Sequence, residues 1–177
     1  MPKRAQTFTY DDDGNLTGDG VWSYVYNAEN QLVRASCALP TGFGSSFSYV
    51  RKRLDFKYDH AGRRIEKRVF DVDASSEVLA RRFVYDGWNL VAELDGNGTN
   101  IQRSYTWGLD VAGNLSSSSS PGSLIQMTNY SGGTPGASYF PSYDDQGNVI
   151  SLVKASDGSL AAVYEVDPIR WTADRVK

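Results

Sequence analysis

The chain has 177 residues, of which 40 % are hydrophobic and 12 % aromatic, which is enough apolar material for a folded domain. Its formal net charge of −3 and isoelectric point near 5.1 argue against general attraction to nucleic acid or to an anionic membrane. No apolar run approaches the roughly 20 residues that span a bilayer, so no membrane span is predicted. The single cysteine, Cys37, excludes an internal disulfide.

From its first predicted strand onward, the chain repeats one short phrase: an aromatic residue, Asp or Asn, a turn with Gly or Asn, and an aliphatic residue. The five copies run from Tyr10 to Leu16, Tyr26 to Leu32, Tyr58 to Ile65, Tyr85 to Leu90 and Tyr143 to Ile150. Successive tyrosines, ending with Tyr164, lie 16, 32, 27, 58 and 21 residues apart. A unit of about 20 residues therefore recurs, with insertions.

Each phrase predicts a β-hairpin. The tyrosine ends one strand, the Asp accepts hydrogen bonds from turn amides, the Gly takes a positive φ, and the aliphatic residue opens the next strand. Between phrases apolar and polar residues alternate, as in Leu54, Phe56 and Tyr58 around Asp55 and Lys57. Two further hairpins are predicted around the Gly-containing turns at 95–98 and 156–159.

The basic residues are concentrated in one segment. Residues 51–82 hold ten of the 18 basic residues of the chain, together with six acidic ones. Alternating signs on neighbouring strands predict a solvated face with cross-strand ion pairs. A surface that binds a polyanion is the alternative.

The segment Gly113–Gly136 is rich in Ser and Gly and is predicted to be a loop, in which Leu124–Met127 could form one short strand. The fold class that the whole pattern predicts is all-β, built from β-hairpin repeats. The predicted organisation is repeat hairpins over 1–112, a Ser/Gly-rich loop over 113–138, a final hairpin over 139–166 and a divergent tail over 167–177.

The repeated Tyr-Asp-x-x-Gly-x-aliphatic phrase resembles the RHS/YD-repeat family of bacterial polymorphic toxins, insecticidal toxin-complex subunits and teneurins. The resemblance covers most of the chain and is most specific at Arg82–Gly87, Tyr105–Asp110 and Tyr143–Ile150. The order of these stretches is similar to the region just upstream of the RHS-associated core domain. In that family the Trp-Gly-Leu-Asp phrase, here Trp107–Asp110, precedes a Gly-rich loop, whose place is taken here by a Ser-rich tract.

The resemblance implies a segment of wall from a large hollow β-shell that encapsulates a C-terminal toxin or other cargo. In a chain of this length the antiparallel β-hairpin repeats are expected to form an open, curved, twisted sheet. Its partners would be the remaining repeats and the core domain of a full-length protein, which would be secreted or displayed at the cell surface. The residues to which the repeat assigns a structural role are Tyr10, Gly14, Tyr26, Tyr58, Gly62, Tyr85, Trp107, Tyr143, Gly147 and Tyr164.

The C-terminal tail departs from the family. Where the family usually continues with Tyr-Asp-Pro-Phe-Gly, this chain keeps only Asp167 and Pro168. The aspartate-dependent self-cleavage motif of the core and the variable toxin tip are therefore expected to be absent from this sequence.

No catalytic constellation is predicted. The only histidine, His60, lies in a repeat turn, where nothing orients a base beside a nucleophile. Asp11, Asp13 and Asn15 alternate like calcium ligands, but the sixth position holds Leu16 instead of the Gly that a calcium loop requires. We therefore expect no enzymatic activity, no cofactor and no bound metal, and we keep calcium as the strongest metal alternative.

The aromatic residues leave one alternative function open. Trp22, Tyr24 and Tyr26 share one face of a predicted strand, while Trp88 and Trp107 lie near turns. Exposed aromatic rows can stack on sugars, so the chain could be a carbohydrate or cell-surface binding module with a glycan partner. Rings that are buried against neighbouring repeats would instead favour the structural role.

Overall fold

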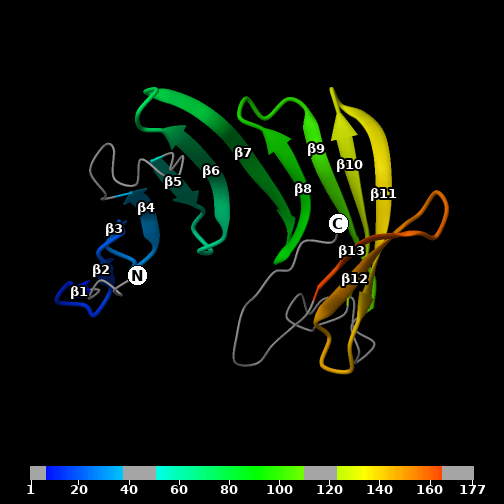
Figure 1. The fold of residues 1–177 in the computed structure, drawn as a ribbon, viewed down its shortest axis with the longest axis horizontal. Helices are drawn as coiled ribbons and strands as arrows, with labels where there is room; N and C mark the ends of the chain where they lie inside the picture. The colour runs from blue at the N-terminus through cyan, green and yellow to red at the C-terminus, as the bar shows by residue number, and fades with distance from the viewer. Residues whose placement is uncertain (1–6, 38–50, 110–122, 165–177) are drawn as a thin grey trace, which may run out of the picture. The chain divides into compact units, whose positions relative to one another are not determined.

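The computed structural model describes residues 7–37, 51–109 and 123–164, and these contain β-strands and turns but no helix (Figure 1). The all-β prediction is therefore confirmed. The chain divides into two compact units, Met1–Arg82 (unit 1) and Phe83–Lys177 (unit 2). Within the described residues no helix has the length and apolar character needed to cross a membrane. The predicted tail at 167–177 lies outside the described residues.

Unit 1 is built from short strands joined by hairpin turns. They are β1 (Thr9–Tyr10), β2 (Leu16–Gly18), β3 (Trp22–Tyr26), β4 (Leu32–Cys37), β5 (Lys52–Tyr58), β6 (Arg64–Asp71) and the first part of β7 (Ser76–Asp86). The longest pairing joins β5 to β6 over seven residue pairs, from Lys52 opposite Asp71 to Tyr58 opposite Arg64.

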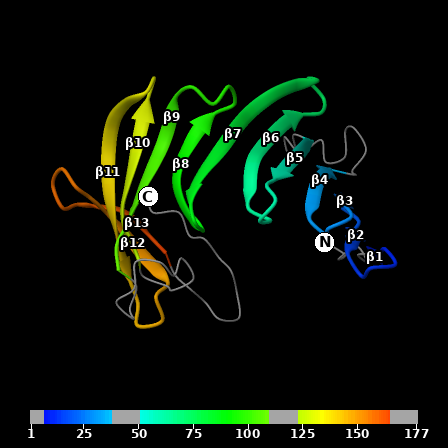
Figure 2. The ribbon, with the colours of Figure 1, turned by 180° about the vertical axis from the view of Figure 1, so that it is seen from behind.

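Unit 2 continues from the last residues of β7. Its strands are β8 (Asn89–Asp95), β9 (Ile101–Trp107), β10 (Leu124–Ser131), β11 (Thr134–Tyr143), β12 (Val149–Lys154) and β13 (Leu160–Val163). Figures 1 and 2 show β8 to β11 of this unit side by side from opposite directions. The hairpins predicted around 95–98 and 156–159 are confirmed as β8–β9 and β12–β13.

The strand order follows the chain from β1 to β13, and the pairing is antiparallel, so the sheet is open as predicted. Each Tyr-Asp phrase joins an odd-numbered strand to the next even-numbered one. Successive turns of an antiparallel meander alternate between the two ends of its strands. The phrase turns after β1, β3 and β5 therefore lie at the same end of the strands of unit 1.

The predicted loop over 113–138 is only partly correct, because it contains β10 and the first residues of β11. Gly132 and Gly133, with φ of 57° and 82°, form a tight two-residue turn between these strands. A hairpin with a two-residue turn requires two consecutive positive φ values. The two glycines are therefore there to form this turn and are not part of a flexible linker. Residues 110–122 of the loop lie outside the described residues.

The described sheet buries very little apolar surface. Ala35 and Cys37 are the only buried hydrophobic residues in the part of the chain that the structure describes, and no large side chain there is fully enclosed. Most strand residues are half-buried, because each has neighbours within the sheet but no second layer above it. Cohesion therefore rests on strand pairing, turns and contacts between side chains of adjacent strands.

The Gly132-Gly133 turn gives a direct test of the corrected hairpin. Gly133→Ala places a Cβ at φ 82° and should lower the free energy of unfolding by about 1 kcal/mol, since an L-residue is strained there. Ala137→Ser, at an exposed position of β11, is the control and should change it by less than about 0.5 kcal/mol. Equal urea-unfolding midpoints for both variants would contradict this turn.

Candidate functional site: the repeated Tyr-Asp turn

The phrase turns share one backbone geometry. In the turns at 11–15, 27–31, 59–63 and 144–148, the N–H of the first residue donates to the carbonyl of the fifth at 3.0 Å. The N–H of the fourth residue donates back to the first carbonyl at 3.0–3.1 Å. The fourth residue has a positive φ in every case: 83° at Gly14, 58° at Asn30, 80° at Gly62 and 80° at Gly147. This conformation explains why only Gly or Asn occupies that position.

In each turn the side chain of the first residue accepts hydrogen bonds from backbone amides of the same turn. In the last turn, Oδ1 of Asp144 accepts hydrogen bonds from the backbone N–H of Gln146 at 2.9 Å and of Asn148 at 2.8 Å, and Oδ2 accepts from the Asn148 side chain at 2.9 Å. Asp11, Asn27 and Asp59 accept the two equivalent amide bonds in their own turns. The predicted role of the Asp is confirmed in these four copies.

One phrase and one further turn vary the scheme. The phrase Tyr85-Asp86 leads into a loop of only Gly87 and Trp88, with φ of 57° at Gly87. The turn that begins at Asp95, which no tyrosine precedes, is one residue longer than the four phrase turns, with the Asp95 N–H donating to the Asn100 carbonyl at 2.9 Å. The Tyr-Asp phrase thus closes with two lengths of turn.

Sequence reasoning missed two turns of the same chemistry. Oδ1 of Asp19 accepts from the N–H groups of Val21 and Trp22, and Oδ1 of Asp71 accepts from Asp73 and Ala74. Neither Asp19 nor Asp71 is preceded by tyrosine. The 71–75 turn contains no Gly, and Ser75 has the positive φ, 51°, that Gly or Asn has in the phrase turns. An Asp at the end of an alternating run was the available signal.

The turn carboxylates are held in their charged form. The side-chain hydrogen bond from Asn15 lowers the pKa of Asp11, and that from Asn148 lowers the pKa of Asp144. The hydrogen bond from the Asn100 side chain, with those from turn amides, lowers the pKa of Asp95 to about 2. These carboxylate oxygens are engaged by the turn itself. Among the described residues no group of three or more acidic, His or Cys side chains could hold a metal ion.

Neighbouring phrase turns of unit 1 also touch each other. The Asn15 side chain donates to Oδ1 of Asn30 at 2.9 Å, joining the first turn to the second. A Cβ on Gly62 would lie 3.3 Å from Nε2 of Gln31, so the absent side chain lets the third turn approach the second. Asn30 therefore has two roles, one in its own turn and one between turns.

Three aromatic side chains fasten the end of one strand to the beginning of the strand before it. The Tyr58 hydroxyl donates to the Leu32 carbonyl at 2.8 Å, and the Tyr143 hydroxyl donates to the Leu124 carbonyl at 2.6 Å. Trp107 repeats the arrangement, since its indole N–H donates to the carbonyl of Leu90 at 2.7 Å. We call these three bonds the aromatic ties.

The aromatic ties explain why an aromatic residue with a hydrogen-bond donor suits the first position of the phrase. Antiparallel neighbours place the last residue of one strand beside the first residues of the preceding one, where the ladder of backbone bonds ends. A half-buried ring with a donor at its tip can reach a carbonyl there. Sequence reasoning assigned the ring to cohesion but did not foresee this bond, since its partner lies 17–26 residues away.

The other predicted structural residues differ in exposure. Tyr26 and Tyr85 are half-buried, as are the three rings of the ties. Tyr10 and Tyr164 are 62 % and 44 % exposed, in contrast to the half-burial expected of the repeat tyrosines. The cause is position, because Tyr10 belongs to the two-residue strand β1 and Tyr164 directly follows β13. The structural roles assigned to these residues remain predictions.

The aromatic row predicted on β3 is confirmed, because Trp22, Tyr24 and Tyr26 alternate with the exposed Ser23 and Val25. The Tyr24 hydroxyl donates to Asp19 at 2.9 Å. Desolvation, with this bond and the Asp19 charge, raises the pKa of Tyr24 to about 12. The polar tip is therefore already engaged inside the protein.

The predicted cross-strand ion pairs of the basic segment are present. With two pairs along single strands, Arg53–Asp55 and Arg68–Glu66, they define what we call the charged face of unit 1. This face is made by Arg34, Arg53, Asp55, Lys57, Glu66, Arg68, Glu77 and Arg82. At its centre Glu66, 7 % exposed, lies 3.0 Å from Lys57, 3.0 Å from Arg68 and 3.6 Å from Arg82. Burial raises the pKa of Glu66, but the hydrogen bonds from Lys57 and Arg68 outweigh it and hold that pKa below its ordinary value.

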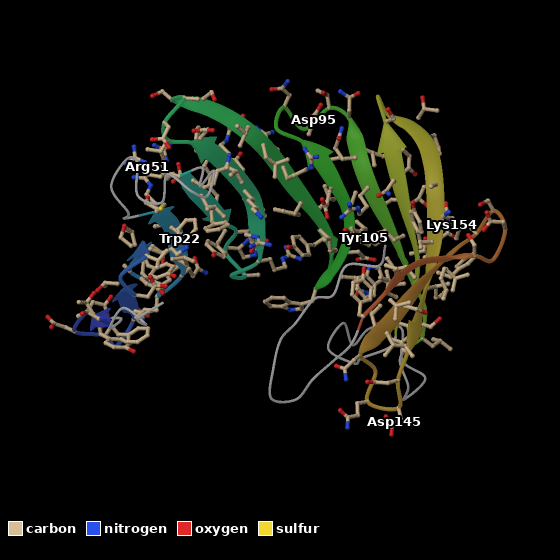
Figure 3. The ribbon with its side chains drawn as sticks, viewed as in Figure 1. Trp22, Arg51, Asp95, Tyr105, Asp145 and Lys154 are labelled. Atoms are coloured by element: carbon tan, nitrogen blue, oxygen red, sulfur yellow. The ribbon has the colours of Figure 1, made fainter. Side chains whose placement is uncertain are left out.

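Unit 2 carries a smaller polar row across β8, β9 and β10. The Tyr105 hydroxyl donates to Glu93 at 2.6 Å, and Arg103, opposite Glu93, donates to the Asn129 side chain at 3.0 Å. Burial, followed by the bond to Glu93, raises the pKa of Tyr105 to about 12. Figure 3 shows Tyr105 on β9, Asp95 at the end of β8 and Asp145 in the turn between β11 and β12. The row joins three strands, and its polar side chains form hydrogen bonds with one another.

No family model matches this chain, but it is similar to curated proteins over a small part of their length. It is 28 % identical over 162 residues, or 92 % of its length, to the tRNA3(Ser)-specific nuclease WapA of Bacillus spizizenii. It is 30 % identical over 103 residues, or 58 % of its length, to the tRNA nuclease WapA of Bacillus subtilis strain 168. The matches cover 6 % and 4 % of those proteins, so the chain spans only a small fraction of either.

Two solved structures are also similar. A Photorhabdus luminescens Tc holotoxin pore with a mutation in TccC3 matches 88 % of this chain and 8 % of its own, at a TM-score of 0.48 and 16 % identity. The crystal structure of TcdB2-TccC3-TEV matches 88 % of this chain and 9 % of its own, at a TM-score of 0.45 and 11 % identity.

The aromatic ties can be tested by removing one hydroxyl. Tyr143→Phe should lower the free energy of unfolding by about 1 kcal/mol, since it deletes one hydrogen bond to the Leu124 carbonyl. Tyr143→Ala should cost roughly 2 kcal/mol, because the ring is only half-buried. Tyr139→Phe, on the same strand, is the control and should change it by less than about 0.5 kcal/mol. Matching urea-unfolding curves for both Phe variants would rule out the tie.

The turn carboxylates predict an acid-dependent stability. The pKa of Asp95 is lowered from 3.8 to about 2, so the stabilisation is complete above pH 3.8 and is lost as the pH falls toward 2. Asp95→Asn should lower the thermal midpoint at pH 6, and the difference from the parent should shrink between pH 4 and pH 2. Asp145→Asn, which removes the same charge at another turn, controls for net charge. A constant difference across this range would oppose the assignment.

Proposed function

We propose that this chain belongs to a protein of the RHS/YD-repeat type and that its strands form a segment of the wall of a larger β-shell that encloses a C-terminal toxin or other cargo. The observation that carries this proposal is the single layer of sheet with almost no buried apolar core. Sheets need a second surface or further repeats to bury their apolar side chains. A wall continued by neighbouring repeats supplies that surface.

Exposed apolar side chains in both units support the same proposal. Val25 in unit 1 and Val84, Trp88, Phe140 and Leu160 in unit 2 are between 41 % and 62 % exposed. These side chains lie on strands or in the turns between them, and they stabilise a sheet only when something covers them. The remaining repeats and core of a full-length protein are the partners that we propose for them.

The hydrogen bonds within and between the hairpins are what a wall of fixed shape would need. The closed turns, the turn-to-turn bond between Asn15 and Asn30, and the aromatic ties all connect a strand to its immediate neighbour. Stability of this kind adds along the chain, as in other repeat proteins. Because strand order follows chain order, further repeats can extend the sheet without rearranging it.

We propose that the described strands have no catalytic role and serve containment. The relatives are named as tRNA nucleases, but the chain corresponds to 6 % or less of each. His60 lies exposed in a turn, and the lone Cys37 is buried in β4. Any activity would belong to other segments of a full-length protein, which we propose is exported like a toxin.

The carbohydrate-binding alternative gains no specific support. A sugar platform needs neighbouring exposed rings, and of the described tryptophans only Trp88 is exposed. Trp107 uses its indole N–H in an aromatic tie, and the hydroxyl of Tyr24 is bonded to Asp19. We therefore do not propose a glycan partner.

The wall proposal can be tested on the full-length polypeptide that contains this chain. Electron microscopy should show a closed particle with these strands in its wall, and the C-terminal segment should resist added protease. The double variant Tyr58→Ala/Tyr143→Ala should make that segment susceptible, whereas Tyr139→Phe should not. Strands that lie outside any closed particle, or a C-terminal segment that is cut equally in all forms, would refute the proposal.

A further inference from the structure

The charged face of unit 1 is not neutral. Four of its cations, Arg34, Arg53, Lys57 and Arg68, share three carboxylates, Asp55, Glu66 and Glu77, which leaves a surplus of one positive charge, and Arg82 also lies 3.6 Å from Glu66. The surplus arises because carboxylates are shared, with Glu66 serving three cations and Asp55 two. The sharing leaves some of these cations incompletely neutralised.

Lys57 and Arg34 lie at the solvent side of the carboxylates that they share with other cations. The side chain of Lys57 is 68 % exposed beside Glu66 at 9 %, and that of Arg34 is 50 % exposed beside Asp55 at 26 %. At these two pairs an approaching anion would therefore meet the ammonium or guanidinium group before the carboxylate. Glu66 holds the Lys57 ammonium group in place, and Asp55 holds the Arg34 guanidinium group.

A groove of about 410 Å³ runs into this face. Its lining includes Arg34, Asp55, Lys57, Glu66 and Arg68, together with apolar residues such as Val25. Val25 lies directly opposite Arg34, which in turn lies opposite Asp55, so apolar and cationic groups stand on neighbouring strands. The groove thus offers contact for an apolar side chain beside contact for an anion.

We propose that this groove binds an extended acidic polypeptide segment that carries an apolar side chain on the same side as its carboxylates. Cations on four adjacent strands, β4 to β7, make a row about 14 Å long at the usual strand spacing, and an extended segment of four or five residues matches it. Side chains two residues apart in such a segment lie on one side at roughly 7 Å, so a carboxylate can reach the row while an apolar side chain two residues away reaches the apolar lining.

The chemistry of the face favours a polypeptide over nucleic acid. Asp55, Glu66 and Glu77 are interspersed among the cations and would repel the continuous charge of a phosphodiester backbone. A segment with spaced carboxylates can avoid them. This inference does not depend on the wall proposal, because it concerns one face of unit 1 only.

The probe for the test is a fluorescent 12-residue peptide that repeats Glu-Ser-Leu-Ser, which puts Glu and Leu on one side of an extended chain, with a peptide of Gln in place of Glu as its uncharged counterpart. Fluorescence anisotropy with the purified chain should show binding of the acidic peptide, weakened by added salt, and no binding of the Gln peptide. An oligonucleotide of equal charge serves as the competing class. Preference for the oligonucleotide, or equal binding of the Gln peptide, would overturn the proposal.

The matched variants act on the same unit without removing a carboxylate's last partner. Arg34→Gln/Lys57→Gln leaves Asp55 with Arg53 and Glu66 with Arg68, and should weaken peptide binding roughly tenfold. Lys67→Gln is the control, since it removes one charge from β6 at the residue between Glu66 and Arg68, whose side chains lie on the opposite side of the strand. Equal loss in control and double variant, or loss in neither, would overturn the proposal. Salt-dependent self-association of the chain that explains the binding would also overturn it.

Discussion

The acceptance of turn amides by one Asp or Asn side chain is the interaction on which the rest of this structure depends. A sheet without a buried core cannot use apolar packing to select its register, so the turns must do so. In the turn at 144–148 the Asp144 carboxylate and Gly147 together fix the chain reversal. The following strand then begins in register, and the aromatic tie at Tyr143 becomes geometrically available.

Much of the fold could be predicted because its determinants are local. The Asp acceptors and the positive φ at Gly14, Gly62 and Gly147 act within five residues, so the phrase displays them directly. The strand pair β10–β11 was missed because Gly132-Gly133 lies in a Ser/Gly-rich context and was interpreted from composition. Local composition and local geometry favour different answers there, and the geometry of the pair is the correct guide.

The features that sequence could not supply are those that depend on the neighbouring strand. The partner of Tyr58 is a carbonyl 26 residues away, and the partner of Asn15 is a side chain in the next turn. The crowding of three cations around Glu66 depends on the alignment of β5, β6 and β7, although the sequence did predict cross-strand ion pairs in general. Exposure of Tyr10 follows from its place on β1, which the phrase alone does not encode.

A sheet one layer thick separates the chemistry of its two sides. In unit 1 the alternation along β5 assigns Asp55 and Lys57 to the charged face, and the residues between them to the other. No second layer ties a substitution on one side to packing on the other. The side chains of the two faces can therefore change independently during evolution. Substitutions on one face can alter what it binds while the other face stays the same, provided that the turns and aromatic ties at the strand ends are kept.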